Sequence, residues 1–391
     1  MTSVYLNQLG LLCPLGNDTE TVYRRLVAGD RSGLVVSDQW HPGHPSPLGR
    51  VDAEPPALPA SMAEYQCRNN QLLLAAFEQL RPAFQRLSRG LDRARIGVVL
   101  GTSTAGIDQG EQVLRQWRAG EPAPAEYHYH QQQLGAGADF LARHLGLDGP
   151  SLTLSTACSS SGRALASARA LIRNDLCDLV IAGGADSLCG LTVQGFHSLG
   201  AVSDRLCNPF SVHRDGINIG EGAALFLLSR EPGPVTLSGV GASSDAHHIS
   251  GPDPQGDGAV TAMQSALDDA GAAAEQVDYL NLHGTATPQN DIMEARAVNR
   301  VFQQPPPSSA TKALTGHCLG AAGALEAAFC WLLLNHPRGP LPPHRFDGDY
   351  DPDLPALDLV GDGRYPATLR RCLSNSFAFG GNNLSLMLEA G

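Results

Sequence analysis

Residues 154–172, LSTACSSSGRALASARALI, decide how the fold of this chain is interpreted. A run of strand-forming residues reaches Cys158, after which small hydroxyl residues and Gly162 lead into an alanine-rich helix. The pattern predicts that Cys158 lies on a strand-to-helix turn, near the helix N-terminus. Backbone N–H groups and the helix dipole there favour a thiolate, so we expect a lowered thiol pKa and a nucleophilic cysteine. A small buried cysteine is the alternative, and the surrounding serines weigh against it.

Strand and helix patterns alternate along most of the chain, which indicates an α/β fold. Of the 391 residues, 42% are apolar and 17% are charged, which allows a large core and excludes a disordered chain. We expect strands at residues 95–103, 177–187, 220–229, 235–243, 277–285 and 384–390, and helices at residues 71–87, 162–173, 258–270, 291–302 and 321–334. The sequence REPGP at residues 230–234 separates two such series. We therefore expect two similar halves that share a core, residues 1–232 and 233–391.

The charge and cysteine content exclude several classes of partner. Thirty-nine acidic residues against 27 basic ones give a net charge of −12 without any basic block, so nucleic acid and membrane surfaces are poor partners. Residues 321–334 are the most apolar stretch, too short and too polar to span a membrane. The first residues lack a signal-peptide charge pattern, so we expect a cytoplasmic protein. The nine cysteines show no metal-ligand spacing and fit a reducing compartment.

The residues around Lys312 form a second group with chemical potential. Lys312 is the only lysine among 27 basic residues, and it lies five residues before His317 in SATKALTGHCLGAAGALEAAFCWLLL. A compact ammonium is needed where a guanidinium would not fit, although a leftover surface lysine is the alternative. Glu326 lies inside an otherwise apolar helix, and a buried carboxylate there requires a partner. We expect that partner to be Lys312.

In two further segments, polar or aromatic residues lie at the expected ends of strands. In YLNLHGTATPQNDIMEARAV a strand ends near His283, and Thr285 and Thr287 offer hydroxyls suited to a polar substrate arm. In CLSNSFAFGGNNLSLML a glycine-rich loop offers backbone N–H groups and the ring of Phe379. A thiol, two histidines and a lysine on loops at strand ends indicate covalent thioester chemistry, in which Cys158 attacks an acyl thioester. A metal site is the competing use of these residues, and their spacing does not support it.

The motifs TACSSS, CNPFSVHRDGINIGEGAALFLL, HGTATPQND, KALTGHCLGAAGALEAA and NSFAFGGNN occur in the order found in one enzyme family. The chain resembles the β-ketoacyl-ACP synthases of the I/II type, in the thiolase superfamily. This resemblance implies a thiolase fold of two mixed-sheet halves in a five-layered αβαβα body. It also implies a homodimer, or a heterodimer with a related chain-length-factor subunit, and substrates carried on the phosphopantetheine of acyl carrier protein. No metal and no other cofactor is implied.

The resemblance assigns roles to five residues of the central group. Cys158 matches the nucleophile that accepts the acyl chain. His283 and His317 match the pair that supports decarboxylation of a malonyl thioester and the developing enolate. Lys312 matches the lysine of the active site, and Glu326 matches the acidic residue associated with it.

The resemblance also assigns four residues nearer the substrate. The backbone N–H groups of Cys158 and Phe379 would form the oxyanion hole, with Phe379 as the gating aromatic. Thr285 and Thr287 resemble the threonines that hold the phosphopantetheine arm. Thr104 matches a position that often lines the acyl pocket.

The sequence departs from the common family pattern in three motifs, which are Gln289-Asn290 before the aspartate, Ser211 in CNPFS, and Ala378 and Asn382 in the last loop. If residue 378 has a positive φ, Ala378 would constrain the hinge of Phe379. The departures favour a specialised synthase, and two segments resemble synthases of aryl polyene pathways. The alternatives are a non-catalytic chain-length-factor-like partner and a thiolase. A thiolase would use a second cysteine as acid and base, and Cys372 lies near the C-terminus but outside a thiolase-like CGGG motif.

Overall fold

Ten strands form a continuous mixed sheet in the computed structural model, which describes residues 2–391 of the chain. The strands of the N-terminal half are β1 (Tyr5–Leu12), β4 (Ile96–Gly101), β5 (Ser151–Leu154), β6 (Leu179–Asp186) and β8 (Gly222–Ser229). Those of the C-terminal half are β9 (Val235–Ser244), β10 (Tyr279–Asn281), β11 (Ser308–Ser309), β12 (Arg371–Ala378) and β13 (Asn382–Ala390).

The two halves of this sheet repeat one topology. The orders β1-β8-β6-β4-β5 and β9-β13-β12-β10-β11 correspond strand by strand, and each half has two antiparallel pairings followed by two parallel ones. A single residue pair, Tyr5 with Thr236, joins β1 to β9. The β8–β9 connection coincides with residues 230–234, where the sequence separates two series of elements. The division into domains 1–232 and 233–391 stays a prediction.

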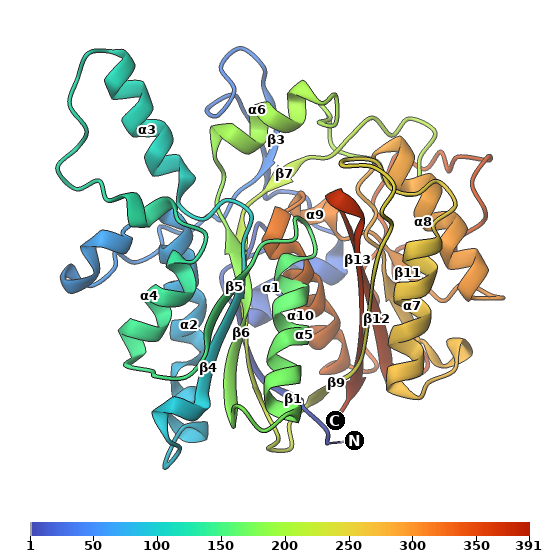
Figure 1. The fold of residues 1–391 in the computed structure, drawn as a ribbon. Coiled ribbons are helices and arrows are strands. Elements are labelled where there is room, and N and C mark those ends of the chain that lie inside the picture. Colours follow the sequence, from blue (N-terminus) through green and yellow to red (C-terminus); the bar gives the residue numbers. More distant parts are fainter. Residues whose placement is uncertain (1) are drawn as a thin grey trace.

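Helices complete five layers, as the resemblance implies. The helices α5 (Ser160–Arg173) and α10 (Ala322–Leu334) lie between the two halves of the sheet (Figure 1). One outer face carries α2 (Arg68–Leu87) and α4 (Ala136–Leu145), and the other carries α7 (Asp257–Ala270) and α8 (Pro288–Val301). Every residue of α10 is buried, because this helix has sheet on both sides and is therefore apolar all round. The αβαβα expectation is confirmed.

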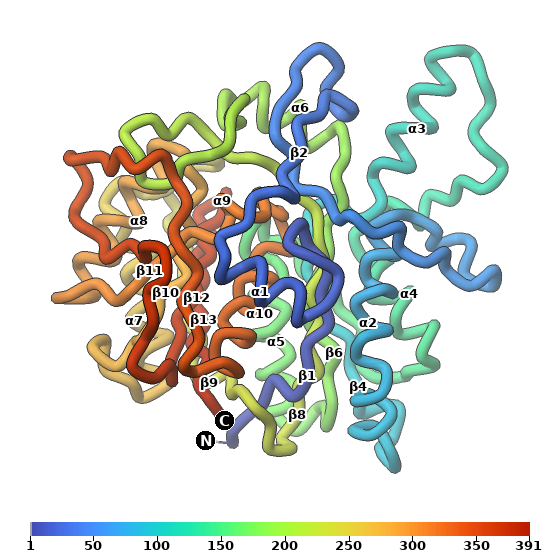
Figure 2. The backbone as a smooth tube through the Cα atoms, turned by 180° about the vertical axis from the view of Figure 1, so that it is seen from behind, coloured from blue at the N-terminus to red at the C-terminus, as the bar shows by residue number. Residues whose placement is uncertain are grey.

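Shorter elements lie at the end of the molecule where α5 begins. They are α3 (Ile107–Arg118), α6 (Gly190–Ser198), α9 (Lys312–Thr315) and a small sheet of β2 (Leu34–Ser37), β3 (Ser46–Gly49) and β7 (Ile219–Gly220). Seen from behind, α3 projects away from the layered body (Figure 2). The helix α1 (Thr19–Ala28) packs on α10. Among the described residues, no helix combines the length and apolar character that crossing a membrane requires.

The predicted elements are all present, with ends shifted by a few residues. The elements that the sequence reasoning missed are β1, β2, β3, β11, β12, α1, α3, α4, α6 and α9. All nine cysteines are unpaired and buried, as expected for small apolar side chains.

Candidate active site

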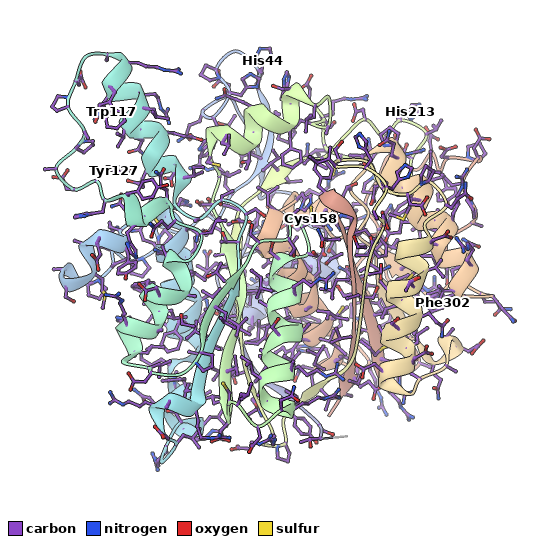
Figure 3. The ribbon with its side chains drawn as sticks, in the orientation of Figure 1. His44, Trp117, Tyr127, Cys158, His213 and Phe302 are labelled. Atoms are coloured by element: carbon purple, nitrogen blue, oxygen red, sulfur yellow. The ribbon has the colours of Figure 1, made fainter. Side chains whose placement is uncertain are left out.

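Cys158 lies on the turn between β5 and α5, as the sequence predicts, and Figure 3 shows it where the two halves of the molecule meet. The preceding residue, Ala157, has a φ of +53°, a left-handed conformation that costs a non-glycine residue free energy and turns the backbone sharply. Serine hydroxyls hold this turn. Ser159 Oγ donates to Thr156 O at 2.8 Å, and Ser160 Oγ donates to Ala157 O at 2.6 Å. The serines therefore stabilise a strained nucleophile turn.

The thiol of Cys158 does not have the low pKa that its place at the helix N-terminus predicts. Burial raises its pKa to about 11, because a thiolate there loses its contact with water. The charge of Lys312 and the backbone N–H groups of Phe379 and Cys158 act in the opposite direction and only partly compensate. The resting residue is a thiol, and negative charge at this position depends on hydrogen-bond donors around Sγ.

His317 is the nearest such donor. Its Nε2 lies 2.9 Å from Cys158 Sγ, and its Nδ1 accepts a hydrogen bond from the N–H of Leu319 at 3.2 Å. Since Nδ1 acts as an acceptor, the proton of the neutral ring lies on Nε2, which points at the sulfur. Burial and the charge of Lys312 lower the pKa of His317 well below its ordinary value, so the ring is neutral.

His283 is also a neutral ring with its proton on Nε2, but a different partner, Lys312, determines this. Its ring lies 5.7 Å from that of His317, and its Nδ1 lies 3.1 Å from Lys312 Nζ, which can only donate. The proton of neutral His283 therefore also lies on Nε2. Burial, the charge of Lys312 and then the neighbouring His317 lower its pKa well below the usual range. Both histidines are neutral donors through Nε2.

Lys312 uses all three of its N–H bonds in this arrangement. Besides His283 Nδ1, it donates to the carbonyl oxygen of His283 at 2.7 Å and to Glu326 Oε1. Both members of the ion pair are 3% exposed, which confirms the expected pairing of Lys312 with Glu326. Three converging acceptors suit the tetrahedral ammonium, whereas a planar guanidinium does not match them. Burial raises the pKa of Glu326 to about 7.

Glu294, on α8, is a site residue that sequence reasoning missed. Its Oε1 accepts the backbone N–H of His283 and its Oε2 that of Gly284, both at 2.7 Å. Asn375 of β12 donates to the same carboxylate at 3.3 Å. Burial raises the pKa of Glu294 to about 7. The signal in the sequence was an acidic residue eleven positions after His283, on a helix face that the core must cover.

A cavity of ≈ 300 Å³ opens onto Cys158 and both histidines. Thr285 and Thr287 line it, with their hydroxyl oxygens 3.0 Å apart. Phe379 also lines it, and its ring centroid lies 5.4 Å from that of Phe196. The cavity thus brings together the predicted thiol, histidines, threonines and aromatic ring.

Two details of this region differ from expectation. Ala378 has a φ of −106°, so it does not occupy a glycine-requiring conformation, and the positive φ values fall on Gly380 and Gly381 instead. Thr104 does not line the described cavity, and its buried hydroxyl donates to Asp186 at 2.8 Å. Its role in an acyl pocket stays a prediction.

Among the described residues, Cys158 is the one cysteine that lines the cavity. Cys372, the cysteine considered for a thiolase, lies in β12 and outside the cavity. Ser211, which departs from the family pattern, donates its hydroxyl to Asp347 at 3.1 Å. These positions leave the thiol and the two histidines as the reactive groups of the cavity.

The geometry defines a class of enzyme that forms a covalent thioester. A thiol faces one imidazole N–H, and a second imidazole N–H shares the cavity. The backbone N–H groups of Cys158 and Phe379 lie close enough to Sγ to lower the thiol pKa. A nucleophile with separate donors for developing negative charge is the arrangement that acyl transfer requires.

Comparisons with known proteins agree with this class. Residues 4–232 match the model of the β-ketoacyl synthase N-terminal domain, and residues 235–345 match that of the β-ketoacyl synthase C-terminal domain. Nodulation protein E of Rhizobium meliloti strain 1021 is 33% identical, covering 99% of this chain and 98% of the relative. The mitochondrial 3-oxoacyl-[acyl-carrier-protein] synthase of Arabidopsis thaliana is 31% identical, covering 99% and 93%. The chain belongs to the β-ketoacyl synthase family.

A solved structure shows the same relation. The ketosynthase ApeO from Xenorhabdus doucetiae, in complex with its chain length factor ApeC, has a TM-score of 0.96 and 45% identity, and the alignment covers 100% of this chain and 98% of that chain. The thiolase-type α/β fold is thereby confirmed. The enzyme is an acyltransferase of the ketosynthase type.

Proposed function

We propose that Cys158 carries the acyl chain during two-carbon elongation. Its Sγ attacks the carbonyl of an acyl thioester on a carrier protein, and the carbon–sulfur bond to the carrier breaks. The carrier leaves as a free thiol that takes the proton lost by Cys158. The Nε2–H of His317, 2.9 Å from Sγ, supports the sulfur while it is negatively charged.

In the second half-reaction, the two histidines stabilise an enolate. A malonyl thioester releases carbon dioxide, and the electrons of the broken bond become an enolate whose oxygen accepts the Nε2–H groups of His283 and His317. The enolate carbon attacks the acyl carbonyl on Cys158 and forms the new carbon–carbon bond. The oxyanion formed there accepts the backbone N–H groups of Cys158 and Phe379, and its collapse releases the Cys158 thiolate. One proton taken up from water returns the Cys158 thiolate to the resting thiol. The substrates and these residues account for every bond that forms or breaks, so we expect no metal and no further cofactor.

One observation carries these assignments. Donors occupy the Nδ1 atoms of both histidines, Leu319 for His317 and Lys312 for His283, so both rings present Nε2–H to one cavity. A protease-type cysteine site would instead need an imidazole that accepts the thiol proton. Here the rings are arranged to donate, which is what an enolate oxygen needs.

We propose that the partners are an acyl carrier protein and a second subunit of the same fold. The ketosynthase from Xenorhabdus doucetiae was solved with its chain length factor, and a type II polyketide ketosynthase, 25% identical to this chain, with an acyl carrier protein. β5 is an edge strand of the sheet, and its Leu152 is 46% exposed, so pairing with another subunit would cover it. The unpaired cysteines favour the cytoplasm. The departures from the common motifs favour a specialised, aryl polyene-type pathway.

Intact-protein mass spectrometry tests the proposal. The chain, alone and with a co-expressed partner subunit, is incubated with acyl carrier proteins bearing chains of varied length and unsaturation. We expect one acyl adduct on the wild type and on the matched control Cys372→Ala, and none on Cys158→Ala. Addition of malonyl carrier protein should then release the elongated product. The ranking of acyl chains identifies the pathway, and efficient use of ordinary saturated chains would contradict the polyene assignment.

A non-catalytic role is the second candidate. The intact set of Cys158, His283, Lys312 and His317 weighs against it. If no donor acylates this chain while a co-purified partner carries the acyl group, the chain is the scaffold and the proposed role of Cys158 is wrong.

A further inference from the structure

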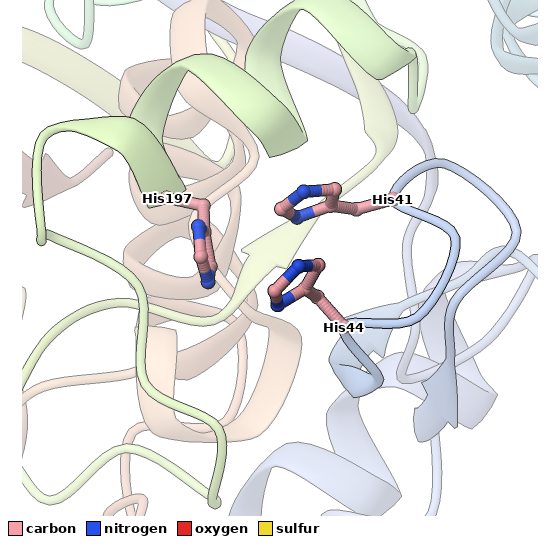
Figure 4. Close-up of side chains that lie close together, drawn as sticks. All are labelled: His41, His44 and His197. Atoms are coloured by element: carbon pink, nitrogen blue, oxygen red, sulfur yellow. The ribbon is translucent and has the colours of Figure 1, made fainter.

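Three histidines meet at the surface, away from the catalytic residues. His41 and His44 lie on the loop between β2 and β3, and His197 lies near the end of α6 (Figure 4). The ring centroids of His41 and His44 are 4.2 Å apart, and His197 lies 4.5 Å from the first and 4.8 Å from the second. One nitrogen from each ring lies within 4.8 Å of the other two.

The loop that carries His41 and His44 is held in place by its own backbone. The N–H of His41 donates to Asp38 O and that of His44 donates to His41 O, each at 3.0 Å. Gly43, between them, has a φ of +83°, which only glycine adopts without strain. The sequence His-Pro-Gly-His-Pro thus forms a rigid turn that presents both imidazoles on one side.

The loop is also fixed to α6. The side chain of Gln194 donates to the carbonyl oxygen of Trp40 at 2.7 Å. Gln194 precedes His197 by three residues, so both lie on the same face of the helix. This contact therefore sets the distance between His197 and the turn.

The ring nitrogens of the three histidines have no hydrogen-bond partner among residues 2–391. The ring nitrogens of surface histidines usually bond to water. Here three rings from two segments of the chain lie together, so each can offer the lone pair of one nitrogen to the same ion. A net charge of −12 attracts cations to the chain.

We propose that His41, His44 and His197 bind a divalent transition metal ion of the zinc type. Imidazole is a favoured ligand of such ions, and three imidazoles with one water give zinc its usual four ligands. Zinc–nitrogen bonds of ≈ 2.0–2.1 Å require ring nitrogens about 3.4 Å apart, so the rings must approach by up to about 1.4 Å. Rotation of partly exposed side chains provides a movement of this size.

Metal binding at this site would affect the wall of the catalytic cavity. Phe196 precedes His197 on α6, lines the cavity and contacts the ring of Phe379. A metal ion bound to His197 and to the β2–β3 loop would restrain this part of α6. The proposal is independent of the reaction at Cys158.

Cobalt and zinc titrations of the Cys158→Ala protein test the site. The background removes Cys158, because Cys158, His283 and His317 could also bind a metal ion. We expect one equivalent of Co²⁺ to produce the visible absorption of a four-coordinate site, and Zn²⁺ to displace it. His44→Gln should weaken binding by more than about tenfold, since even loss of an outer-shell partner costs 10–100-fold. His44 is exposed, so this substitution should leave the melting temperature without metal unchanged.

His213→Gln is the matched control, because His213 belongs to the other surface group of candidate ligands, with Asp347 and Asp349. Binding that is lost in the His44 variant and kept in the His213 variant supports the proposal. Binding that is unchanged by His44→Gln, or the absence of any binding at concentrations far above those of the protein, would overturn it.

Discussion

Substitution of Glu294 by glutamine should make the stability of the protein less dependent on pH while slowing the reaction. The carboxylate is fully buried and accepts the N–H groups of His283 and Gly284. Burial raises its pKa from 4.5 to about 7, so the native state holds the proton more tightly than the unfolded chain. The contribution of Glu294 to stability is therefore greatest below pH 4.5, declines as the pH rises from 4.5 and is lost above about 7.

The size of this effect follows from the same values. A rise from 4.5 to about 7 corresponds to about 3 kcal/mol of stability lost above pH 8. Glutamine has the shape of the protonated acid and no charge, so Glu294→Gln removes this loss. With an unfolding entropy of about 2.1 cal/mol/K per residue over 391 residues, 3 kcal/mol corresponds to about 4 °C.

Melting temperatures at pH 5, 6.5 and 8, measured by fluorescence at one protein concentration, provide the assay. Relative to the wild type, the melting temperature of the variant should rise by about 3–4 °C between pH 5 and pH 8, from a value lowered at both by the backbone donor that the glutamine NH₂ leaves without an acceptor. The exposed matched control Glu275→Gln should show the same small difference at each pH. A difference between Glu294→Gln and the wild type that does not change with pH refutes the reasoning. Because the glutamine NH₂ faces one of the two backbone donors, product formation should fall about tenfold or more.

Three further predictions concern Cys158, Lys312 and Ala157. Alkylation of Cys158 by iodoacetamide, followed by mass spectrometry of the site, should accelerate about tenfold per pH unit up to pH 9, because burial raises the thiol pKa to about 11; a plateau below pH 8 contradicts this. Lys312→Met should lower the melting temperature by about 4–6 °C, since a broken buried ion pair costs about 3–5 kcal/mol, and Lys312→Arg should not restore decarboxylation of malonyl carrier protein, as measured by carbon dioxide release. Ala157→Val should slow acylation and destabilise the chain, because a β-branched residue tolerates a φ of +53° poorly. Ala157→Gly should keep the melting temperature within about 1 °C of the wild-type value. Equal effects of the two substitutions would contradict the role of backbone strain.

The features that the sequence predicted well are local ones. The turn at Cys158 could be predicted because β-type residues, serines and Gly162 follow one another within a few positions. The pairing of Lys312 with Glu326 could be predicted because a carboxylate in an apolar helix requires a partner. In each case a few neighbouring residues determine the structure.

The features that were missed depend on packing between distant segments. The thiol pKa follows from complete burial of Cys158, which the helix N-terminus alone does not indicate. The strand β12 escaped prediction because its centre, Ser374–Ser376, is polar although buried, and these side chains find partners only in the folded chain. Asn375, for example, accepts a hydrogen bond from Ser385 at 2.8 Å and donates to Glu294. The meeting of His41 with His197 likewise depends on the position of α6.

The single lysine has a practical consequence for chemical labelling. Lys312 is 3% exposed, and its ammonium is enclosed by His283 and Glu326. Apart from the α-amino group, it is the only primary amine in the chain. An amine-reactive ester can therefore add a second label only when the core around Lys312 opens. The rate of that second labelling step would report how often the catalytic centre becomes accessible to solvent, without any engineered probe.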